Sequence, residues 1–124
     1  MGRLGDLIYT KEKEEKVLGE KHTPFIDAPD KVGPEETFEV TVVVGKEVPH
    51  PNTIEHHIKW IQVYAREDDR PFNPIHVATF DLGPAYGEPN VKFKMKLKKS
   101  STLHVIEYCN LHGLWEASKR IEVG

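Results

Sequence analysis

Residues 91–97 read VKFKMKL, and no other stretch of the chain alternates apolar and polar side chains so strictly. Successive side chains of a strand point to opposite faces, so the apolar residues of this stretch face a core and its lysines face water. Residues 38–44, FEVTVVV, follow the same two-residue period and end at Gly45. Both stretches therefore predict strands of a sheet with one solvated face.

Shorter stretches of strand character occupy much of the remaining chain, at residues 58–64, 75–80, 102–108 and 114–123. They are separated by segments rich in proline, glycine and polar residues, at 46–53, 66–74, 83–90, 98–101 and 109–113. Proline cannot donate a backbone hydrogen bond to a central ladder, so we expect these segments to be loops. Six or seven short strands with almost no helical period predict an all-β fold, an immunoglobulin-like antiparallel β-sandwich of about seven strands.

The first 19 residues differ from the rest of the chain. Leu4, Leu7 and Ile8 have helical spacing, and a run of lysine and glutamate follows at residues 11–16. We expect a charged, mobile or short helical leader with few core contacts over residues 1–19, and one β-sandwich domain over residues 20–124. The leader lacks an apolar core of signal-peptide length, and no stretch approaches the roughly 20 apolar residues of a spanning helix. A cytoplasmic protein with no membrane partner is therefore expected.

The composition narrows the classes of partner and site. The 124 residues carry 17 Lys and Arg against 20 Asp and Glu, a net charge of -3, so the chain lacks the broad positive field that nucleic-acid binding uses. No nucleic-acid partner is expected. Its one cysteine, Cys109, excludes an intrachain disulfide and any four-cysteine zinc or iron site, and it fits a reducing cytoplasm. Seven histidines beside one cysteine direct attention to metal or acid–base chemistry.

The seven histidines fall into two groups. Four lie at or beside loop positions and are candidates for a site, namely His22, His50, His56 and His112. The other three are interpreted as structural. His76 and His104 lie in the middle of alternating strands, and His57 projects to the side opposite His56. Trp60 and Trp115 are assigned to the core first, and either could also shield the site.

The spacing of the candidate residues favours a shared ion. Cys109 and His112 form a C-x-x-H bend, which lets a thiolate and an imidazole reach one ion. His50 lies between two prolines, and His56 follows six residues later on the same expected loop, so a stiffened backbone loses little entropy on coordination. One thiolate with several neutral imidazoles suits iron, zinc or copper better than magnesium or calcium. The residues alone leave these three metals open.

Three stretches of the sequence also carry a family resemblance. They are GEKHTP at residues 19–24, VGKEVPHPNTIEHHI at 44–58 and YCNLHGLW at 108–115. In this order they resemble the superoxide reductase family, and more narrowly its one-iron members, the neelaredoxins. The matching blocks cover residues 19–64 and 91–116. Residues 1–19 have neither the length nor the thiols for the N-terminal four-cysteine domain of the two-iron relatives.

The resemblance implies one mononuclear non-haem iron per chain, as Fe2+ or Fe3+, in an enzyme that reduces superoxide to hydrogen peroxide with one electron and two protons. Its four equatorial imidazoles and its axial thiolate would be His22, His50, His56, His112 and Cys109. Glu20 matches the residue that takes the sixth position in the ferric state. Lys21 matches the lysine beside it, and we assign Lys21 and Lys46 to attracting superoxide, with Lys21 also ordering the water that delivers a proton.

The same resemblance implies an immunoglobulin-like sandwich, assembly as a homotetramer, and rubredoxin as the electron donor. The chain departs from the family pattern in two places. The region between residues 64 and 91 is shorter and different, and the leader is longer and more charged. Both departures bear on the oligomer interface and the loop cover, and neither touches an implied ligand.

Two alternatives from other classes remain open on the residues alone. A structural zinc site in an interaction module would use Cys109, His112 and two further histidines in a closed tetrahedron, leaving one histidine spare. A metal-free sandwich used for partner binding would keep its stability when metal is removed. Within iron chemistry, dismutation differs from reduction by the release of dioxygen.

Overall fold

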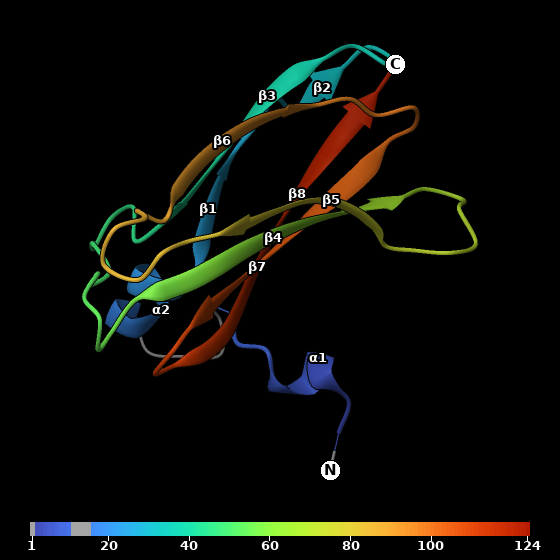
Figure 1. Cartoon of the computed structure of the whole chain (residues 1–124). Coiled ribbons are helices and arrows are strands. Elements are labelled where there is room, and N and C mark those ends of the chain that lie inside the picture. Colours follow the sequence, from blue (N-terminus) through green and yellow to red (C-terminus); the bar gives the residue numbers. More distant parts are fainter. Residues whose placement is uncertain (1, 11–15) are drawn as a thin grey trace.

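Two β-sheets packed face to face form the body of the protein (Figure 1). The structure is a computed structural model, and it describes residues 2–10 and 16–124. Its strands are β1 (Pro24–Asp27), β2 (Lys31–Val32), β3 (Phe38–Val44), β4 (Ile58–Glu67), β5 (Ile75–Asp81), β6 (Asn90–Met95), β7 (Ser101–Cys109) and β8 (Gly113–Val123). Two short helices precede them, α1 (Leu4–Leu7) and α2 (Lys16–His22). Within the described ranges, neither helix is long and apolar enough to cross a membrane.

The smaller sheet has the strand order β1-β3-β6, and the larger has the order β2-β8-β7-β4-β5. The long antiparallel pairs of β7 with β4 and with β8 hold the larger sheet together. Ile58 lies opposite Cys109 at one end of this sheet, and Glu67 lies opposite Ser101 at the other. The end of β7 therefore fixes where the cysteine sits.

The core lies between the inward faces of the two sheets. In β3 the buried residues alternate with half-buried and exposed ones, as the two-residue period predicts, and Val40 and Val42 are fully buried. The same alternation runs through β7, and the four lysines of residues 92–98 are all exposed. Each buried valine, leucine or isoleucine stabilises the fold by about 1.5–3 kcal/mol. A slip of one residue in these strands would turn that whole set toward water, so the register is strongly specified.

The predicted all-β sandwich is confirmed, with differences in detail, among them that β4 runs on to Glu67, into the segment expected to be a loop. The structure has eight strands rather than about seven, because β1 and β2 hold only four and two residues, too few for a period to show. β2 pairs with β8 in parallel, so the expectation of wholly antiparallel pairing is wrong at this pair. β6 ends at Met95, two residues before its predicted end, although Leu97 remains buried.

Two residues of the expected leader, Ile8 and Tyr9, attach to the sandwich. Ile8 is buried, and Tyr9 forms a parallel β-bridge with Trp115, making two 2.9 Å backbone hydrogen bonds to β8. The helical spacing near the start does give α1, whose leucines are exposed. α2 runs across the expected boundary between residues 19 and 20. Residues 11–15 of the charged run lie outside the described residues.

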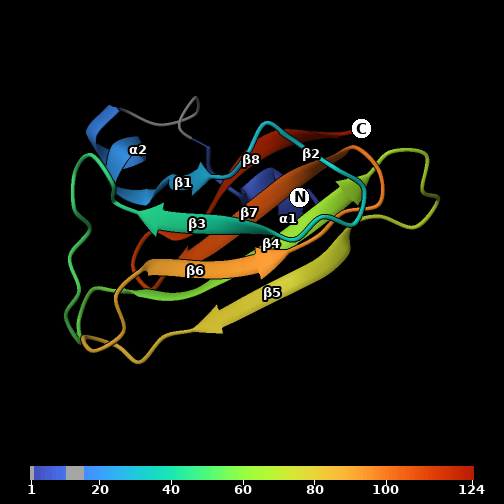
Figure 2. The ribbon, with the colours of Figure 1, turned by 90° about the horizontal axis from the view of Figure 1, so that it is seen from above.

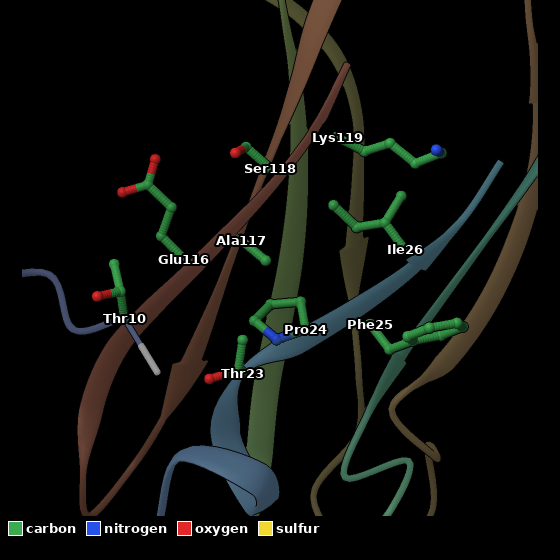
Figure 3. A pocket seen from close by; sticks show the side chains of 9 residues that line it. All are labelled: Thr10, Thr23, Pro24, Phe25, Ile26, Glu116, Ala117, Ser118 and Lys119. Atoms are coloured by element: carbon green, nitrogen blue, oxygen red, sulfur yellow. The ribbon is translucent and has the colours of Figure 1, made fainter. Parts of the chain in front are cut away.

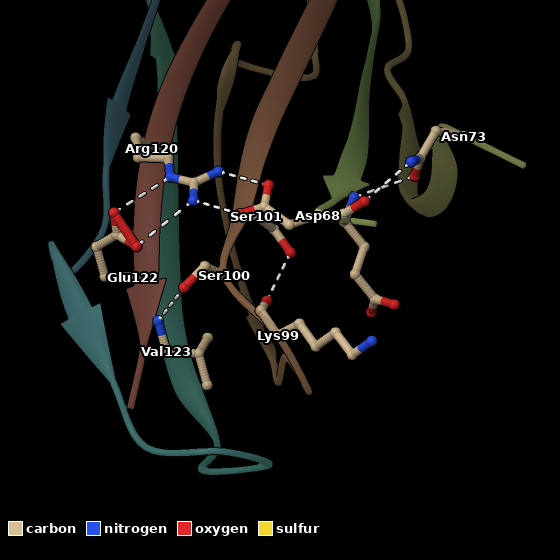
Figure 4. Close-up of polar contacts among 9 residues, drawn as sticks. Asp68, Asn73, Lys99, Ser100, Ser101, Arg120, Glu122 and Val123 are labelled. Atoms are coloured by element: carbon tan, nitrogen blue, oxygen red, sulfur yellow. Dashed lines mark hydrogen bonds and ion pairs between the residues drawn. The ribbon is translucent and has the colours of Figure 1, made fainter. Parts of the chain in front are cut away.

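Polar contacts fasten the end of the sandwich where β4 stops and β7 begins (Figure 4). Arg120 donates from its two terminal nitrogens to the two carboxylate oxygens of Asp68, at 2.9 and 2.6 Å, and Asn73 bonds to the backbone of Glu67. The turn after β7 lies at the opposite end of the sheet, with α2 and the loop before β4 beside it in both views (Figures 1 and 2). The ten residues of β4 separate the two ends by about 30 Å.

Candidate metal centre

Three segments that are distant in the sequence meet at one end of the sandwich: the last turn of α2, the loop over residues 45–57, and the β7–β8 hairpin (Figures 1 and 2). Gly45 has a positive φ of 84°, and a Cβ on it would lie 2.5 Å from the backbone nitrogen of His50. Glycine is therefore required for the loop to fold back this closely. In the hairpin, Cys109 pairs with Gly113, whose φ of 82° helps the chain to reverse over three residues.

Asn110 ties the loop to the hairpin. Its Oδ1 accepts the backbone N–H of His57 at 2.8 Å, and its Nδ2 donates to the Glu55 carbonyl at 2.9 Å. Its own backbone N–H donates to the His57 carbonyl at 3.2 Å. These three bonds hold the segment that carries His56 against the segment that carries Cys109.

The four loop histidines form a closed cycle of rings, which we call the imidazole cycle. The centroids of successive rings are 4.7 Å apart for His22 and His50, 4.6 Å for His50 and His56, 5.1 Å for His56 and His112, and 4.8 Å for His112 and His22. The planes of successive rings are inclined by 63° to 82°, so each ring turns an edge toward the next. His22 and His56 lie across the cycle, with centroids 6.4 Å apart.

The imidazole cycle fits a single ion at its centre. Half of the 6.4 Å between the His22 and His56 centroids is 3.2 Å. That length matches a metal–nitrogen bond of about 2.1 Å followed by the roughly 1.1 Å from a ring nitrogen to its centroid. Nε2 of His56 is buried and has no hydrogen-bond partner among the described residues, which is costly for a buried nitrogen unless an ion uses it. Ligand atoms that all lie within 4.8 Å of one another come from His22, His56, Cys109 and His112.

His50 and Cys109 contact each other within the same cluster. Nε2 of His50 lies 3.2 Å from Nε2 of His22 and 3.4 Å from Sγ of Cys109. Cys109 is fully buried, and its Sγ accepts the backbone N–H of His112 at 3.4 Å. Burial raises the pKa of the Cys109 thiol, although the backbone N–H groups of Leu111 and His112 act in the opposite direction. A bound cation would override the effect of burial, because a coordinated thiol is deprotonated outright.

Backbone carbonyls orient two of the rings. Nδ1 of His22 lies 2.8 Å from the Leu18 carbonyl, and Nδ1 of His50 lies 2.6 Å from the Pro51 carbonyl. A carbonyl oxygen only accepts, so both Nδ1 atoms carry the proton and both Nε2 lone pairs are left for the cluster. Burial lowers the pKa of His22, and it lowers the pKa of His50 to about 4. Both rings are therefore neutral at neutral pH, the form that binds metal.

The three candidate charged residues have different surroundings. Glu20 and Lys21 are half-buried residues of α2 directly before His22, and neither side chain makes a hydrogen bond or ion pair within the part of the chain that the structure describes. After the larger effect of burial, the charge of Lys21 helps to lower the pKa of both His22 and His56, so it acts on the cluster. Lys46 is engaged elsewhere, with its Nζ 3.5 Å from the centroid of the Phe25 ring. Its assignment as an attracting charge stays a prediction.

The other three histidines lie outside the imidazole cycle. They bond to a backbone carbonyl, a hydroxyl and a carboxylate: His57 to Thr53, His76 to Thr79 and His104 to Glu116. These contacts agree with their structural interpretation. A tetrahedral zinc site made of Cys109 and three histidines would leave the fourth histidine outside the cluster. In the structure all four rings belong to the imidazole cycle, and each has two neighbouring rings.

Two further residues lie at the site; the sequence leaves open whether Trp115 shields it and assigns no role to Glu107. Trp115, assigned to the core, is indeed buried, but its ring also stacks on His22 with centroids 4.9 Å apart, and its Nε1 donates to the His112 carbonyl at 3.2 Å. Glu107 is fully buried two residues before Cys109, and neither of its carboxylate oxygens has a partner among the described residues. Burial raises the pKa of Glu107 well above its ordinary value. An acidic residue at an inward position of the 102–108 alternation was the signal that could have found it.

A hollow of about 620 Å³ lies between β1 and β8, with Thr23 and Phe25 on one side and Glu116 and Lys119 on the other (Figure 3). No histidine or cysteine lines it. Among the described residues that line it, only Glu116 offers a typical metal ligand, its carboxylate. The donor set for a metal is therefore found in the imidazole cycle and not in this hollow.

Comparison with known proteins points to the same chemistry. The family described as desulfoferrodoxin matches residues 12–118. The chain is 41% identical to a putative superoxide reductase of Thermotoga maritima, over 98% of each chain, and 40% identical to a neelaredoxin of Megalodesulfovibrio gigas, over 82% of this chain and 87% of that one. The solved superoxide reductase (neelaredoxin) from Ignicoccus hospitalis is 48% identical, with a TM-score of 0.92 over 99% of this chain and 100% of that chain. This chain therefore belongs to the desulfoferrodoxin family, and within it to the superoxide reductases of the neelaredoxin type.

Proposed function

We propose that this chain is a superoxide reductase, which reduces superoxide to hydrogen peroxide at one iron held by His22, His50, His56, His112 and Cys109. The observation that carries the proposal is the closed imidazole cycle with the buried sulfur of Cys109 beside it. Four imidazoles and a thiolate exceed the four ligands of a structural zinc site and suit a transition metal such as iron. Relatives that are named superoxide reductases, at 41% to 48% identity, support the same activity.

The charges at the site favour an anionic substrate. Four neutral imidazoles and one thiolate bring a single negative charge to a divalent ion, so the loaded site keeps a positive charge of about one. When bound, iron supplies the electron that superoxide takes up. Lys21, whose charge already acts on His22 and His56, adds to the attraction and orders the water that delivers a proton.

Glu20 and Lys46 have auxiliary roles in this proposal. Glu20 precedes Lys21 on α2 and has no partner within the described ranges, so its carboxylate is available to neutralise the oxidised site until reduction releases it. Lys46 provides a second attracting charge, for which its ammonium group must first leave the Phe25 ring. Such an exposed cation–π contact is worth about 0.5–1 kcal/mol, so it is readily broken. The His112 backbone N–H withdraws electron density from the Cys109 sulfur and tunes the site.

We also propose the wider setting of the enzyme. Residues 20–124 would form the iron-binding domain and residues 1–19 its leader, although α2 joins the two. The family resemblance supports a homotetramer that receives electrons from rubredoxin. The single thiol at Cys109 supports a cytoplasmic location, where a lone cysteine stays reduced.

Metal analysis together with visible spectra of the oxidised and reduced protein tests the function. We expect one iron per chain, an absorption band of the oxidised protein that disappears on reduction, and loss of superoxide without release of dioxygen. Cys109→Ser should lose the band and most of the activity. Glu20→Ala should keep the fast reaction with superoxide and shift the ferric spectrum. A colourless, zinc-loaded protein from the native source, or dioxygen released as superoxide is consumed, would contradict the proposal.

A further inference from the structure

Two loops that are distant in the sequence lie side by side at the end of the sandwich that carries the imidazole cycle (Figures 1 and 2). One is the loop over residues 45–57, which carries His50 and His56. The other is the loop over residues 82–89, between β5 and β6. The second loop contributes no ring to the imidazole cycle, yet it is bonded to the first loop between the two histidines.

Asn52 joins the two loops through its side chain. Its Oδ1 accepts the backbone N–H of Ala85 at 3.1 Å, and its Nδ2 donates to the Glu88 carboxylate at 2.8 Å and to the Gly87 carbonyl at 3.3 Å. Ala85 has a positive φ of 71°, a conformation that residues other than glycine rarely adopt, and its bond to Asn52 holds it there. We call these three bonds the Asn52 clamp.

The clamp fixes the peptide group that orients the ring of His50. The Pro51 carbonyl belongs to the peptide group that ends at the nitrogen of Asn52, and it accepts the Nδ1–H of His50 at 2.6 Å. The proline ring fixes φ of Pro51, so the direction of this carbonyl depends on one remaining dihedral and therefore on where Asn52 is held. Nε2 of His50 is thereby directed into the cluster, 3.2 Å from Nε2 of His22 and 3.4 Å from Sγ of Cys109.

The clamp also supports the turn that presents His56. Thr53 follows Asn52 directly, its backbone N–H donates to the His56 carbonyl at 2.8 Å, and its Oγ1 accepts the His56 N–H at 3.0 Å. Beyond this turn, Asn110 holds residues 55 and 57 against the β7–β8 hairpin. The loop that carries the two histidines is therefore fastened at two places, to the hairpin by Asn110 and to its neighbouring loop by Asn52.

We propose that Asn52 is a positioning residue of the metal centre, which sets the direction of the His50 ring by holding the Pro51 carbonyl through its bonds to the 82–89 loop. The proposal rests on the proposed function in one respect, because it takes His50 as a ligand of the metal. A hydrogen bond to the second nitrogen of a histidine ligand orients the ring, and disturbing such a partner lowers metal affinity about 10- to 100-fold. The effect of Asn52 passes through His50.

Metal affinity separates positioning from general support of the fold. Binding of Co²⁺ is followed by its visible absorption in competition with a chelator. Asn52→Ala is expected to weaken binding about 10- to 100-fold. Asn73→Ala is the matched control, because the Asn73 side chain also makes three bonds, to the backbone of Glu67 and Arg70, at the opposite end of the sandwich. It should change the affinity by less than about threefold, as expected for a distant site.

An exchange of polar groups tests the clamp directly. Asn52→Asp places a carboxylate against that of Glu88, where the asparagine donates at 2.8 Å, so this bond is lost. The added negative charge alone would strengthen the binding of a cation, whereas a broken clamp weakens it. In the double variant Asn52→Asp with Glu88→Gln, the amide introduced at position 88 donates to the new carboxylate, and the net charge of the chain is unchanged. This variant should recover the affinity of the unaltered protein to within about threefold.

The Nδ1–H proton of His50 gives a second measurement, which depends on neither affinity nor activity. In the 15N-labelled, zinc-loaded protein this proton should resonate far downfield and exchange slowly with water, because its bond to the Pro51 carbonyl is 2.6 Å long. Both features should be lost in Asn52→Ala. They should be kept in Asn73→Ala and in the double variant.

Four results would overturn the positioning role of Asn52. They are equal losses of affinity in Asn52→Ala and Asn73→Ala, tighter binding by Asn52→Asp, a double variant that binds no better than Asn52→Asp, and a His50 proton signal that Asn52→Ala leaves unchanged. These readouts require neither iron nor superoxide. A chain that binds Co²⁺ as expected, but neither holds iron nor reacts with superoxide, would overturn the proposed function and leave the role of Asn52 standing.

Discussion

Acidification of the metal-free protein is expected to destabilise its fold through His50. Burial is the main reason that the pKa of His50 falls from 6.5 to about 4, with smaller contributions from the other rings of the imidazole cycle. The unfolded chain takes up a proton near pH 6.5, and the folded chain resists it until about pH 4. Between these values the unfolded state binds more protons, so stability falls as the pH falls. The loss from His50 between pH 7 and pH 5 is about 2 kcal/mol, and it approaches about 3 kcal/mol at pH 4.

Urea unfolding of the metal-free protein at pH 7, 6 and 5 and constant ionic strength measures this loss. His50→Gln carries no titrating group at this position, so its free energy of unfolding should fall by about 2 kcal/mol less than that of the unaltered protein. His76→Gln, at an exposed position of β5, should follow the unaltered protein. If His50→Gln loses as much stability as the unaltered protein over this range, the burial of a neutral His50 ring is refuted.

Three further substitutions test the surroundings of the site. Trp115→Phe removes the indole bond to the His112 carbonyl and part of the buried stack, and it should lower the free energy of unfolding by about 1–3 kcal/mol in urea titrations. Asn110→Ala cuts the side-chain bonds between the loop and the hairpin, including that to His57, and should weaken iron binding about 10- to 100-fold in competition with a chelator; an unchanged affinity would exclude a positioning role. Burial raises the pKa of Glu107 well above its ordinary value of 4.5, so folding takes up a proton above about pH 4.5 and stability falls as the pH rises. Glu107→Gln should therefore exceed the unaltered protein in stability at pH 8 and approach it at pH 4, and a gap that does not depend on pH would contradict this account.

The strands with strict alternation could be predicted well, because burial of one face imposes the period. β3 begins and ends at the predicted residues, 38 and 44. β2 could not be predicted, because a two-residue strand has no period and its parallel partner is 91 residues away. The burial of Ile8 was missed for a similar reason, since pairing of residue 9 with β8 is a long-range backbone contact that no local pattern records.

The C-x-x-H bend and the loop histidines could be proposed as candidate ligands from the sequence because they are local features, whereas the full set of five was implied by the family resemblance. Their supporting residues could not be proposed. The stacking of Trp115 on His22 depends on how β8 meets α2, and the placement of Lys46 over Phe25 depends on how a loop passes β1. Both contacts are products of tertiary packing, which a pattern of residue types along the chain does not specify.

The carbonyls of Leu18 and Pro51 hold the rings of His22 and His50 through hydrogen bonds that involve no ion. Part of the metal site is therefore formed before a cation binds. A preformed site of this kind binds first-row divalent cations in the order of their intrinsic affinities, which rise toward copper. It does not select ferrous iron over the others. Cellular supply then decides which cation is carried. Cells grown in excess zinc are expected to yield a folded, colourless and inactive form of the same chain.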